Sequence, residues 1–295
     1  MIKGRKIVPY IYLILSVFMN ASSSVFGKIF NKQNERKKDS TIFYNFLLMV
    51  SVCVGWGLLY AFNFSFTINV LWYSVLFAVC YTVCNIGIIN GLKYGPATLT
   101  SLLIGLSLLV TTIWGFIFWN VEVTVTVIIG LILVVCAITL CLYTKQKDEK
   151  TISWKWLFYV TLAFFGNAGC AIIQRTQQIQ YNGEHGNMLM LFAAVFSALA
   201  YLVIYLKSNR EDTPTMLKTS WWTPVCAGLC NVILNVFVML MALTDLSPSL
   251  IYPVIGVGGL AVVTVFSLFI FKEKMRWWQW IGVAIGAIAT VLLSI

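Results

Sequence analysis

The chain has 295 residues, of which 60% are hydrophobic and only 10% are charged, and its mean hydropathy is +0.89. This composition leaves too little polar surface for a soluble globule, so it predicts a polytopic membrane protein. The net charge of +10 comes from Lys and Arg residues spread along short connections. That distribution favours anionic lipid headgroups as partners and argues against nucleic acid.

Ten apolar segments are each long enough for a helix that crosses the hydrocarbon core, which takes about 20 residues. The first follows a basic N-terminus and has no small-residue cleavage site after it, so we expect a membrane helix and not a cleaved signal peptide. None of the short connections has a glycine-rich phosphate loop, and we expect no cofactor. The ten segments cover residues 7–30, 41–62, 69–92, 96–119, 122–143, 155–177, 186–207, 219–243, 247–271 and 276–295.

One motif in the middle of the chain occurs twice. Residues 80–85 read CYTVCN and residues 226–231 read CAGLCN, an offset of 146 residues, while FMNA at 18–21 matches FGNA at 165–168 at an offset of 147. The charged residues 144–150 divide the ten segments into five and five, which predicts one repeat over residues 1–150 and a second over residues 151–295. Because five is odd, the second repeat must be inverted. The predicted fold is an all-α polytopic membrane protein of ten transmembrane helices in two inverted five-helix repeats.

Polar residues near the middle of the predicted helices are candidates for substrate contact, since such groups usually face the bundle interior or a water-filled cavity. Carboxamides occur in two helices of each half at similar depth. An alternative interpretation, with even odds for any one residue, is that they join helices by hydrogen bonds. The candidate substrate-binding residues are Asn20, Ser24, Tyr81, Asn85, Ser107, Asn167, Asn231, Asn235 and Tyr252.

The run PVIGVGG at residues 253–259 predicts a bend in the ninth segment, because proline removes a backbone donor and glycine is permissive. Pro253, Gly256 and Gly258 are therefore candidate gating residues. Close helix packing through small residues explains the same pattern at least as well. Gly282 and Gly286 have a similar spacing in the last segment, so we expect a monomer or a weak homodimer.

Ionisable residues are scarce inside the predicted helices. None of the segments has Asp or Glu at its middle, which argues against proton uptake on a mid-membrane carboxylate. Lys28 and Arg175 occupy equivalent positions at the ends of two helices. We interpret them as interfacial anchors, with anion binding as the alternative. All eight cysteines lie in apolar segments and the single histidine, His185, lies in a loop, so we expect no metal site.

Lys and Arg are distributed unequally between the two sides of the predicted bundle. Sixteen of the 20 follow odd-numbered segments. Taken alone, this bias places those connections in the cytoplasm and both termini outside. The basic N-terminus argues for the opposite orientation.

Three stretches carry a resemblance to a known family: GLKYGPAT at 91–98, its counterpart ALTDLSPS at 242–249, and FKEKMRWWQWIG at 271–282. Through them the chain resembles the drug/metabolite transporter superfamily, in its ten-helix EamA-like branch. The resemblance implies a basket of helices around a central cavity, alternating access, and cytosolic termini. It also implies export of amino acids, nucleotide sugars, purines or other small metabolites, often by exchange or ion coupling. The small multidrug relatives have a membrane-embedded glutamate in their first helix. The first predicted segment of this chain has Asn20 and serines in that region instead.

We therefore expect a secondary transporter that moves a small polar, neutral or zwitterionic metabolite across a bacterial plasma (inner) membrane. Its expected partners are a small-molecule substrate, membrane lipid, and a coupling ion or counter-substrate. The alternative is a lipid-linked sugar flippase of the same fold, whose cavity would open sideways to lipid. A membrane-embedded enzyme is the poorer rival, because the sequence offers no evident nucleophile, base or metal site. A purely structural membrane subunit is disfavoured by the buried polar set.

Overall fold

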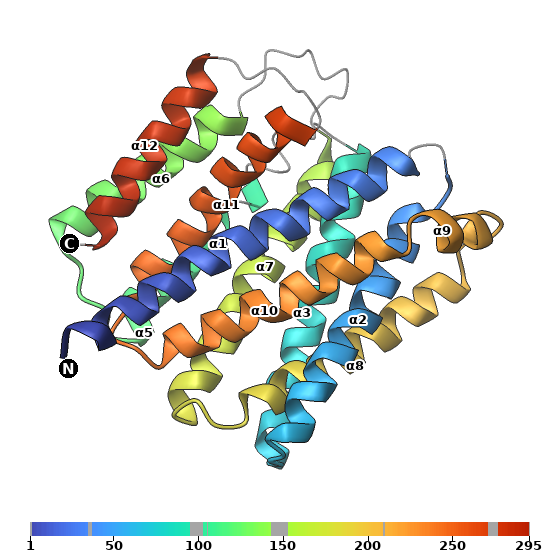
Figure 1. Ribbon diagram of the computed structural model, residues 1–295, viewed down its shortest axis with the longest axis horizontal. Helices are drawn as coiled ribbons and strands as arrows, with labels where there is room; N and C mark the ends of the chain where they lie inside the picture. Colours follow the sequence, from blue (N-terminus) through green and yellow to red (C-terminus); the bar gives the residue numbers. More distant parts are fainter. Residues whose placement is uncertain are drawn as a thin grey trace.

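The computed structural model describes residues 2–34, 37–94, 103–104, 106–142, 153–208, 210–270 and 277–294, and these form eleven labelled helices (Figure 1). The predicted linker at 144–150, Pro96, Gly105 and the stretch 271–276 lie outside the described residues. The helices are α1 (Ile2–Gln33), α2 (Ser40–Phe62), α3 (Ile68–Tyr94), α5 (Leu108–Phe118), α6 (Val125–Leu142), α7 (Trp154–Gln180), α8 (Gly186–Leu206), α9 (Thr213–Thr219), α10 (Trp222–Ala242), α11 (Pro248–Ile270) and α12 (Trp277–Ser294).

Among the described residues, six helices are long and apolar enough to cross a membrane, namely α1, α2, α3, α7, α8 and α10. Shorter apolar stretches occur in α5, α6, α11 and α12, at the places where the sequence predicts the remaining spans. The chain is thus an integral membrane protein, while the number of ten spans stays a prediction. The short helix α9 lies in a polar connection where no helix was expected.

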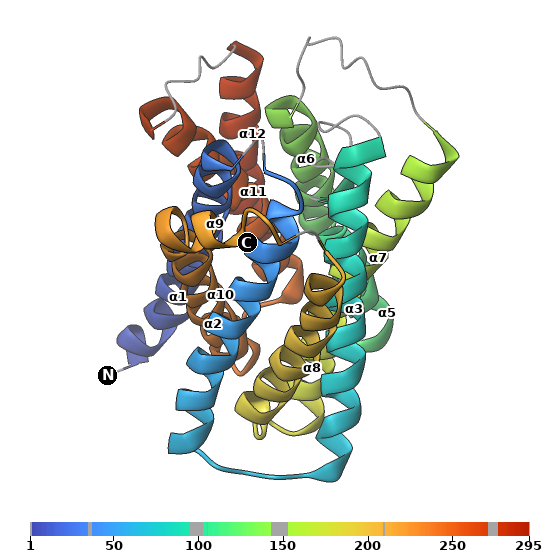
Figure 2. The ribbon, with the colours of Figure 1, turned by 90° about the vertical axis from the view of Figure 1, so that its right-hand side faces the viewer.

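The helices pack in pairs that join the two halves of the chain. α3 lies along α7, α1 along α10, α6 along α12 and α2 along α8, and in every pair one helix precedes residue 150 and the other follows it (Figures 1 and 2). The two halves therefore interlock and do not form separate bodies.

Two large hydrophobic clusters and a small third one, around Phe30, fill the interior. One large cluster gathers residues of α1, α6, α10, α11 and α12, including Leu13, Ile138 and Ile251. The other large cluster gathers residues of α2, α3, α8 and α10, among them the fully buried Trp56 and Met188. α10 contributes to both large clusters and so connects them.

The closest helix crossing involves α3 and α7. A Cβ atom on Gly87 would lie 2.5 Å from the backbone oxygen of Tyr159 and 2.7 Å from the backbone nitrogen of Ala163. On the opposite helix, a Cβ atom on Gly166 would lie 2.7 Å from the backbone oxygen of Cys80. Only glycine allows the two backbones to approach this closely without a shift.

An interruption of regular helix occurs at Ser107, immediately before α5. The sequence instead predicts a bend at residues 253–259, but α11 is continuous through Pro253. Gly258 faces Val17 of α1, and its neighbour Gly259 faces the side-chain amide of Asn20. Small residues in this stretch therefore serve close packing of α11 against α1, and gating by Pro253, Gly256 and Gly258 stays a prediction.

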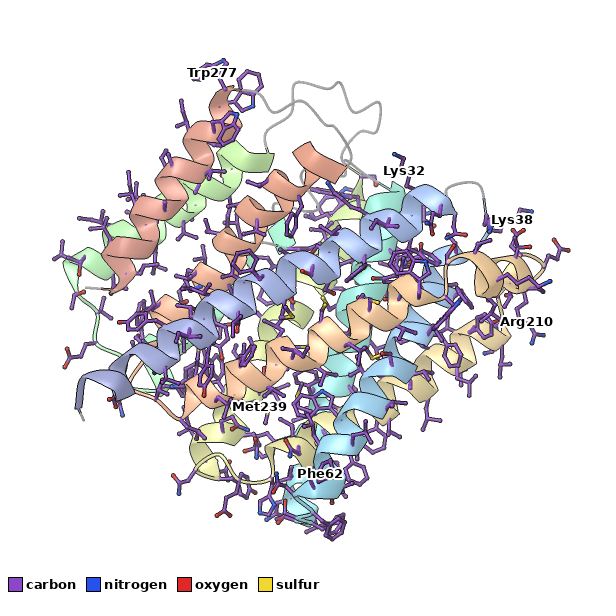
Figure 3. The ribbon with its side chains drawn as sticks, in the orientation of Figure 1. Lys32, Lys38, Phe62, Arg210, Met239 and Trp277 are labelled. Carbon is purple, nitrogen blue, oxygen red and sulfur yellow. The ribbon has the colours of Figure 1, made fainter. Side chains whose placement is uncertain are left out.

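Basic side chains mark one end of the bundle. Lys32, Lys38 and Arg210 lie together at that end, whereas Phe62 lies at the other (Figure 3). This separation matches the unequal distribution of Lys and Arg in the sequence.

From that charge bias we expect the end with Lys38 and Arg210 to face the cytoplasm. Cysteine placed by Lys38→Cys should react with a membrane-impermeant maleimide only after the cells are permeabilised, whereas Phe64→Cys should react in intact cells. The unmodified protein controls for its native cysteines. Labelling of Lys38→Cys in intact cells would establish the opposite orientation.

Candidate substrate-binding site

The asparagine of α1 and its counterpart in α7 each reach a neighbouring helix. The Asn20 side chain donates to the backbone oxygen of Ile255 in α11 at 3.3 Å. The Asn167 side chain donates to the Oγ atom of Ser107 at 2.7 Å. Ser107 is fully buried. Thus two candidate residues, Asn167 and Ser107, contact each other, at the point where the helix before α5 is interrupted.

The hydrogen bond between Asn167 and Ser107 provides a test of the structural interpretation. Asn167→Ala and Ser107→Ala should share a coupling free energy of about 0.6 kcal/mol, the average found for polar contacts between membrane helices. The measurement is a double-mutant cycle of unfolding in detergent. As a control, Asn45→Ala should be additive with Ser107→Ala, because the Asn45 amide donates to Thr41 of its own helix. Additivity of the first pair would contradict a direct bond.

The carboxamides of α10 form a small cluster with α7. The Asn235 side-chain nitrogen donates to the backbone oxygen of Asn231 at 2.8 Å and to its Oδ1 atom at 3.1 Å. The Oδ1 atom of Asn235 accepts a hydrogen bond from Gln174 of α7 at 3.2 Å. The amide cluster, defined as Gln174, Asn231 and Asn235, therefore bridges the two sides of the interior between α7 and α10.

The other predicted site residues contact backbone or aromatic groups. Asn85 donates to the backbone oxygen of Tyr81 in its own helix at 2.9 Å, and Tyr81 stacks on Phe77. Ser24 is exposed and its hydroxyl donates to the backbone of Asn20. Tyr252 of α11 is buried, and its hydroxyl lies 3.5 Å from the backbone oxygen of Ala171 in α7.

The C-terminal part of α7 is more polar inside than the sequence analysis anticipated. Gln174, Gln177 and Gln178 are buried, as is Arg175, which is only 9% exposed. The side-chain nitrogen of Gln178 donates to Gln177 at 2.6 Å, and that of Gln177 donates to the backbone oxygen of Glu184 at 2.8 Å. The expectation of an interfacial anchor is wrong for Arg175, whose side chain is enclosed by protein. The signal in the sequence was the run of polar residues at positions 174–178, within an otherwise apolar segment.

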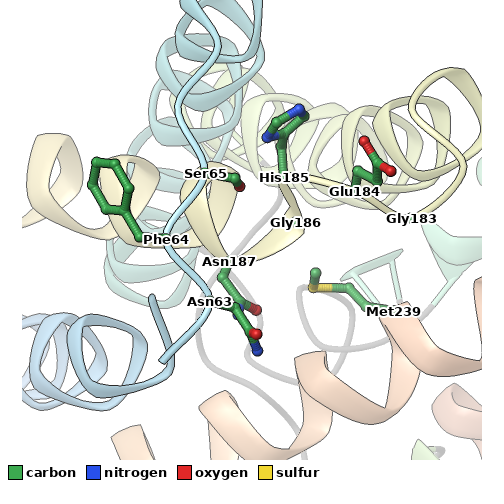
Figure 4. Close-up of a pocket in the computed structure, with 9 residues that line it drawn as sticks. All are labelled: Asn63, Phe64, Ser65, Gly183, Glu184, His185, Gly186, Asn187 and Met239. Atoms are coloured by element: carbon green, nitrogen blue, oxygen red, sulfur yellow. The ribbon is translucent and has the colours of Figure 1, made fainter. Parts of the chain in front are cut away.

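A cavity of about 400 Å³ lies where the connections between α2 and α3 and between α7 and α8 meet (Figure 4). His185 in its wall accepts or donates one hydrogen bond to Thr67 through Nε2 at 3.0 Å, while its Nδ1 atom is buried without a partner. A Cβ atom on the lining residue Gly186 would lie 2.8 Å from the side-chain nitrogen of Gln178, so the cavity borders the buried glutamines. The lining residues are Asn63, Phe64, Ser65, Gly183, Glu184, His185, Gly186, Asn187 and Met239.

Comparison with known proteins identifies the first half of the chain. A model of the EamA-like transporter family matches residues 7–143, which span the first five predicted segments. This part of the chain is similar to the EamA-like transporter family. The resemblance expected from the sequence motifs is therefore confirmed, and members of this family are transporters and not enzymes.

Two curated proteins are similar over shorter stretches. A probable magnesium transporter, NIPA9 of Arabidopsis thaliana, is 38% identical over 68 residues, which cover 23% of this chain and 20% of that protein. The uncharacterized protein y4nH of Sinorhizobium fredii is 27% identical over 110 residues, or 36% of this chain and 93% of that protein. The chain thus matches only about a fifth of the length of NIPA9.

One solved structure, described only as the crystal structure of a protein, matches with a TM-score of 0.72 over 97% of this chain and 96% of its own length. Its sequence identity is 10%, so the likeness concerns the fold alone. The shared fold covers almost the whole chain.

Proposed function

We propose that the protein is a secondary transporter that moves a small polar, neutral or zwitterionic metabolite through the bundle by alternating access. The observation that carries the proposal is the amide cluster of Gln174, Asn231 and Asn235, which joins α7 to α10 in the apolar interior. Carboxamides offer both donors and acceptors, which suits an uncharged or zwitterionic cargo. Similarity to the EamA-like family supplies the transporter class.

The packing of the helices supports two inverted repeats that move as units during transport. If the halves are exchanged, α1 corresponds to α7, α3 to α10, α2 to α8 and α5 to α11. Each packed pair then maps onto another packed pair. The pair of α1 and α10 becomes α7 and α3, and the pair of α3 and α8 becomes α10 and α2. The pair of α1 and α11 becomes α7 and α5, and all six of these pairs are in contact. Asn20 and Asn167 follow the same exchange, because each donates to the helix that the exchange assigns to it. Rocking of one repeat against the other would expose the interior alternately to each side.

The test is exchange in proteoliposomes made with the purified full-length protein. Vesicles are loaded with a mixture of amino acids, nucleosides and sugars, and the uptake of isotope-labelled members of each class is compared with that of protein-free vesicles. We expect at least one labelled compound to enter the protein-containing vesicles faster than the protein-free vesicles. Loading the vesicles with the same unlabelled compound should increase this uptake further.

Two further cargoes distinguish the alternatives. Magnesium belongs in the panel because a partial relative is named as a probable magnesium transporter. Uptake of Mg²⁺ alone would contradict a metabolite cargo. Translocation of a lipid-linked sugar, with no water-soluble compound moved, would identify the flippase instead.

A further inference from the structure

Arg175 is a charged side chain enclosed within the bundle. It lies on α7, more than a helical turn before the end at Gln180, and is 9% exposed. Its Nε and Nη1 atoms are buried, and neither has a hydrogen-bond partner among the described residues. Two buried guanidinium nitrogens without an acceptor are costly, so their presence requires an explanation other than stability.

Neutral polar groups occur beside Arg175 along α7 and on the neighbouring α11. Gln174, its neighbour in sequence, belongs to the amide cluster with Asn235. The Tyr252 hydroxyl lies against the backbone of Ala171, one turn before Arg175 on the same helix. The buried polar side chains in the described part of the chain include no Asp or Glu. Within that part, the protein itself supplies no buried carboxylate to neutralise the guanidinium.

We propose that Arg175 binds a carboxylate group of the transported molecule. This inference rests on the proposed function and narrows its cargo to molecules with a carboxylate, such as amino acids. Carboxylate oxygens would accept from the guanidinium in charge-assisted hydrogen bonds. The Gln174, Asn231 and Asn235 side chains, close along α7 and α10, would contact the remaining polar groups.

The charge of the site favours a carboxylate over two other cargoes. Arg175 is the single buried basic residue among those whose side chains the structure describes, so one negative charge balances it, whereas a dianionic phosphate would remain partly uncompensated. A divalent cation would be repelled by the same guanidinium. A zwitterion with one carboxylate fits both the charge and the neutral amides.

The experiment measures thermal unfolding of the purified full-length protein with each proteinogenic L-amino acid and with its carboxamide, which lacks the negative charge. Inorganic phosphate and magnesium chloride are included as the competing ions. A ligand that binds only the folded state raises the transition temperature, and a concentration series gives the midpoint of binding. We expect at least one amino acid to stabilise the protein and its carboxamide to be inert.

Three variants assign the effect to Arg175. Arg175→Gln should weaken binding of that amino acid by about tenfold or more, since hydrogen bonds to charged groups are the strong ones. Arg175→Lys keeps the charge and should retain part of the affinity, which also guards against a folding defect in the first variant. Lys28→Gln, at the equivalent position of the other repeat and exposed in the structure, should bind normally.

Equal binding of the amino acid by wild type, Arg175→Gln and Arg175→Lys would overturn the inference. So would equal stabilisation by the carboxamide, or stabilisation by phosphate but by no amino acid. If a sugar or nucleoside exchanges across the membrane and Arg175→Gln does not affect it, the transporter proposal stands and the carboxylate inference falls. If Arg175 binds an amino acid that is not exchanged, the binding site stands and the transporter proposal falls.

Discussion

Gly87→Leu should prevent stable folding, because α3 and α7 touch backbone to backbone at this position. A Cβ atom alone would lie 2.5 Å from the Tyr159 oxygen and 2.7 Å from the Ala163 nitrogen, and backbone atoms cannot yield as a flexible side chain can. Overpacking of an interior costs about 1–3 kcal/mol for smaller insertions. A leucine adds further atoms at the same point, so we expect a larger loss.

Gly87→Ala separates this steric effect from helix propensity. In a helix, replacing glycine by alanine normally stabilises by about 0.5–1 kcal/mol, so a lower transition temperature for Gly87→Ala would mean that the clash exceeds that gain. Gly57→Ala in α2 is the matched control, because its Cβ would meet only Leu191 at an ordinary 3.9 Å. It should be neutral or slightly stabilising.

The measurement is thermal unfolding in detergent together with the yield of monodisperse protein for all three variants. If Gly87→Leu were as stable as Gly57→Ala, α3 and α7 would have to lie farther apart than the structure places them. In that case the interlocking of the two halves through this crossing would also be wrong.

The helical part of the fold could be predicted from hydrophobicity, since a membrane helix is specified by the length of an apolar run. Each of the ten predicted segments coincides with an apolar helix or a stretch of one. Two features escaped that reasoning. The helix α9 is short and lies in a polar connection, and the interruption at Ser107 occurs in a segment without a proline nearby. Neither the short helix nor the interruption changes the mean hydropathy of its segment, so hydropathy could not predict them.

The candidate site was only partly predictable. The sequence named Asn167, Ser107, Asn231 and Asn235 as candidates for substrate contact. The hydrogen bond between Asn167 and Ser107 depends on helix packing, so residue spacing could not predict it. Gln174 and Arg175 were missed as interior residues because they stand near the end of a predicted segment, where polar side chains usually reach interfacial water. Burial of this end of α7 by neighbouring helices reverses that interpretation.

Asn235→Leu should reduce exchange of the fastest cargo by about 10- to 100-fold, the effect expected when buried polar groups lose a hydrogen-bonding partner. Asn235 holds the amide cluster together, since its side chain donates to Asn231 and accepts from Gln174. Leucine is similar in size but removes both bonds, so the interior stays filled while its polar contacts are lost. Stability should change little, by about 0.6 kcal/mol for each lost contact.

Asn90→Leu is the matched control, because the Asn90 amide donates to Ile86 within α3 and makes no hydrogen bond to another helix in the described part of the chain. Both variants are reconstituted at equal protein density, and the initial rate of exchange is measured beside the unfolding temperature. Normal exchange by Asn235→Leu would remove the amide cluster from the transport path. An equal loss in Asn90→Leu would mean that any polar-to-apolar change in these helices impairs the protein. A selective loss in Asn235→Leu, with unfolding temperatures unchanged, is the result that places the cargo between α7 and α10.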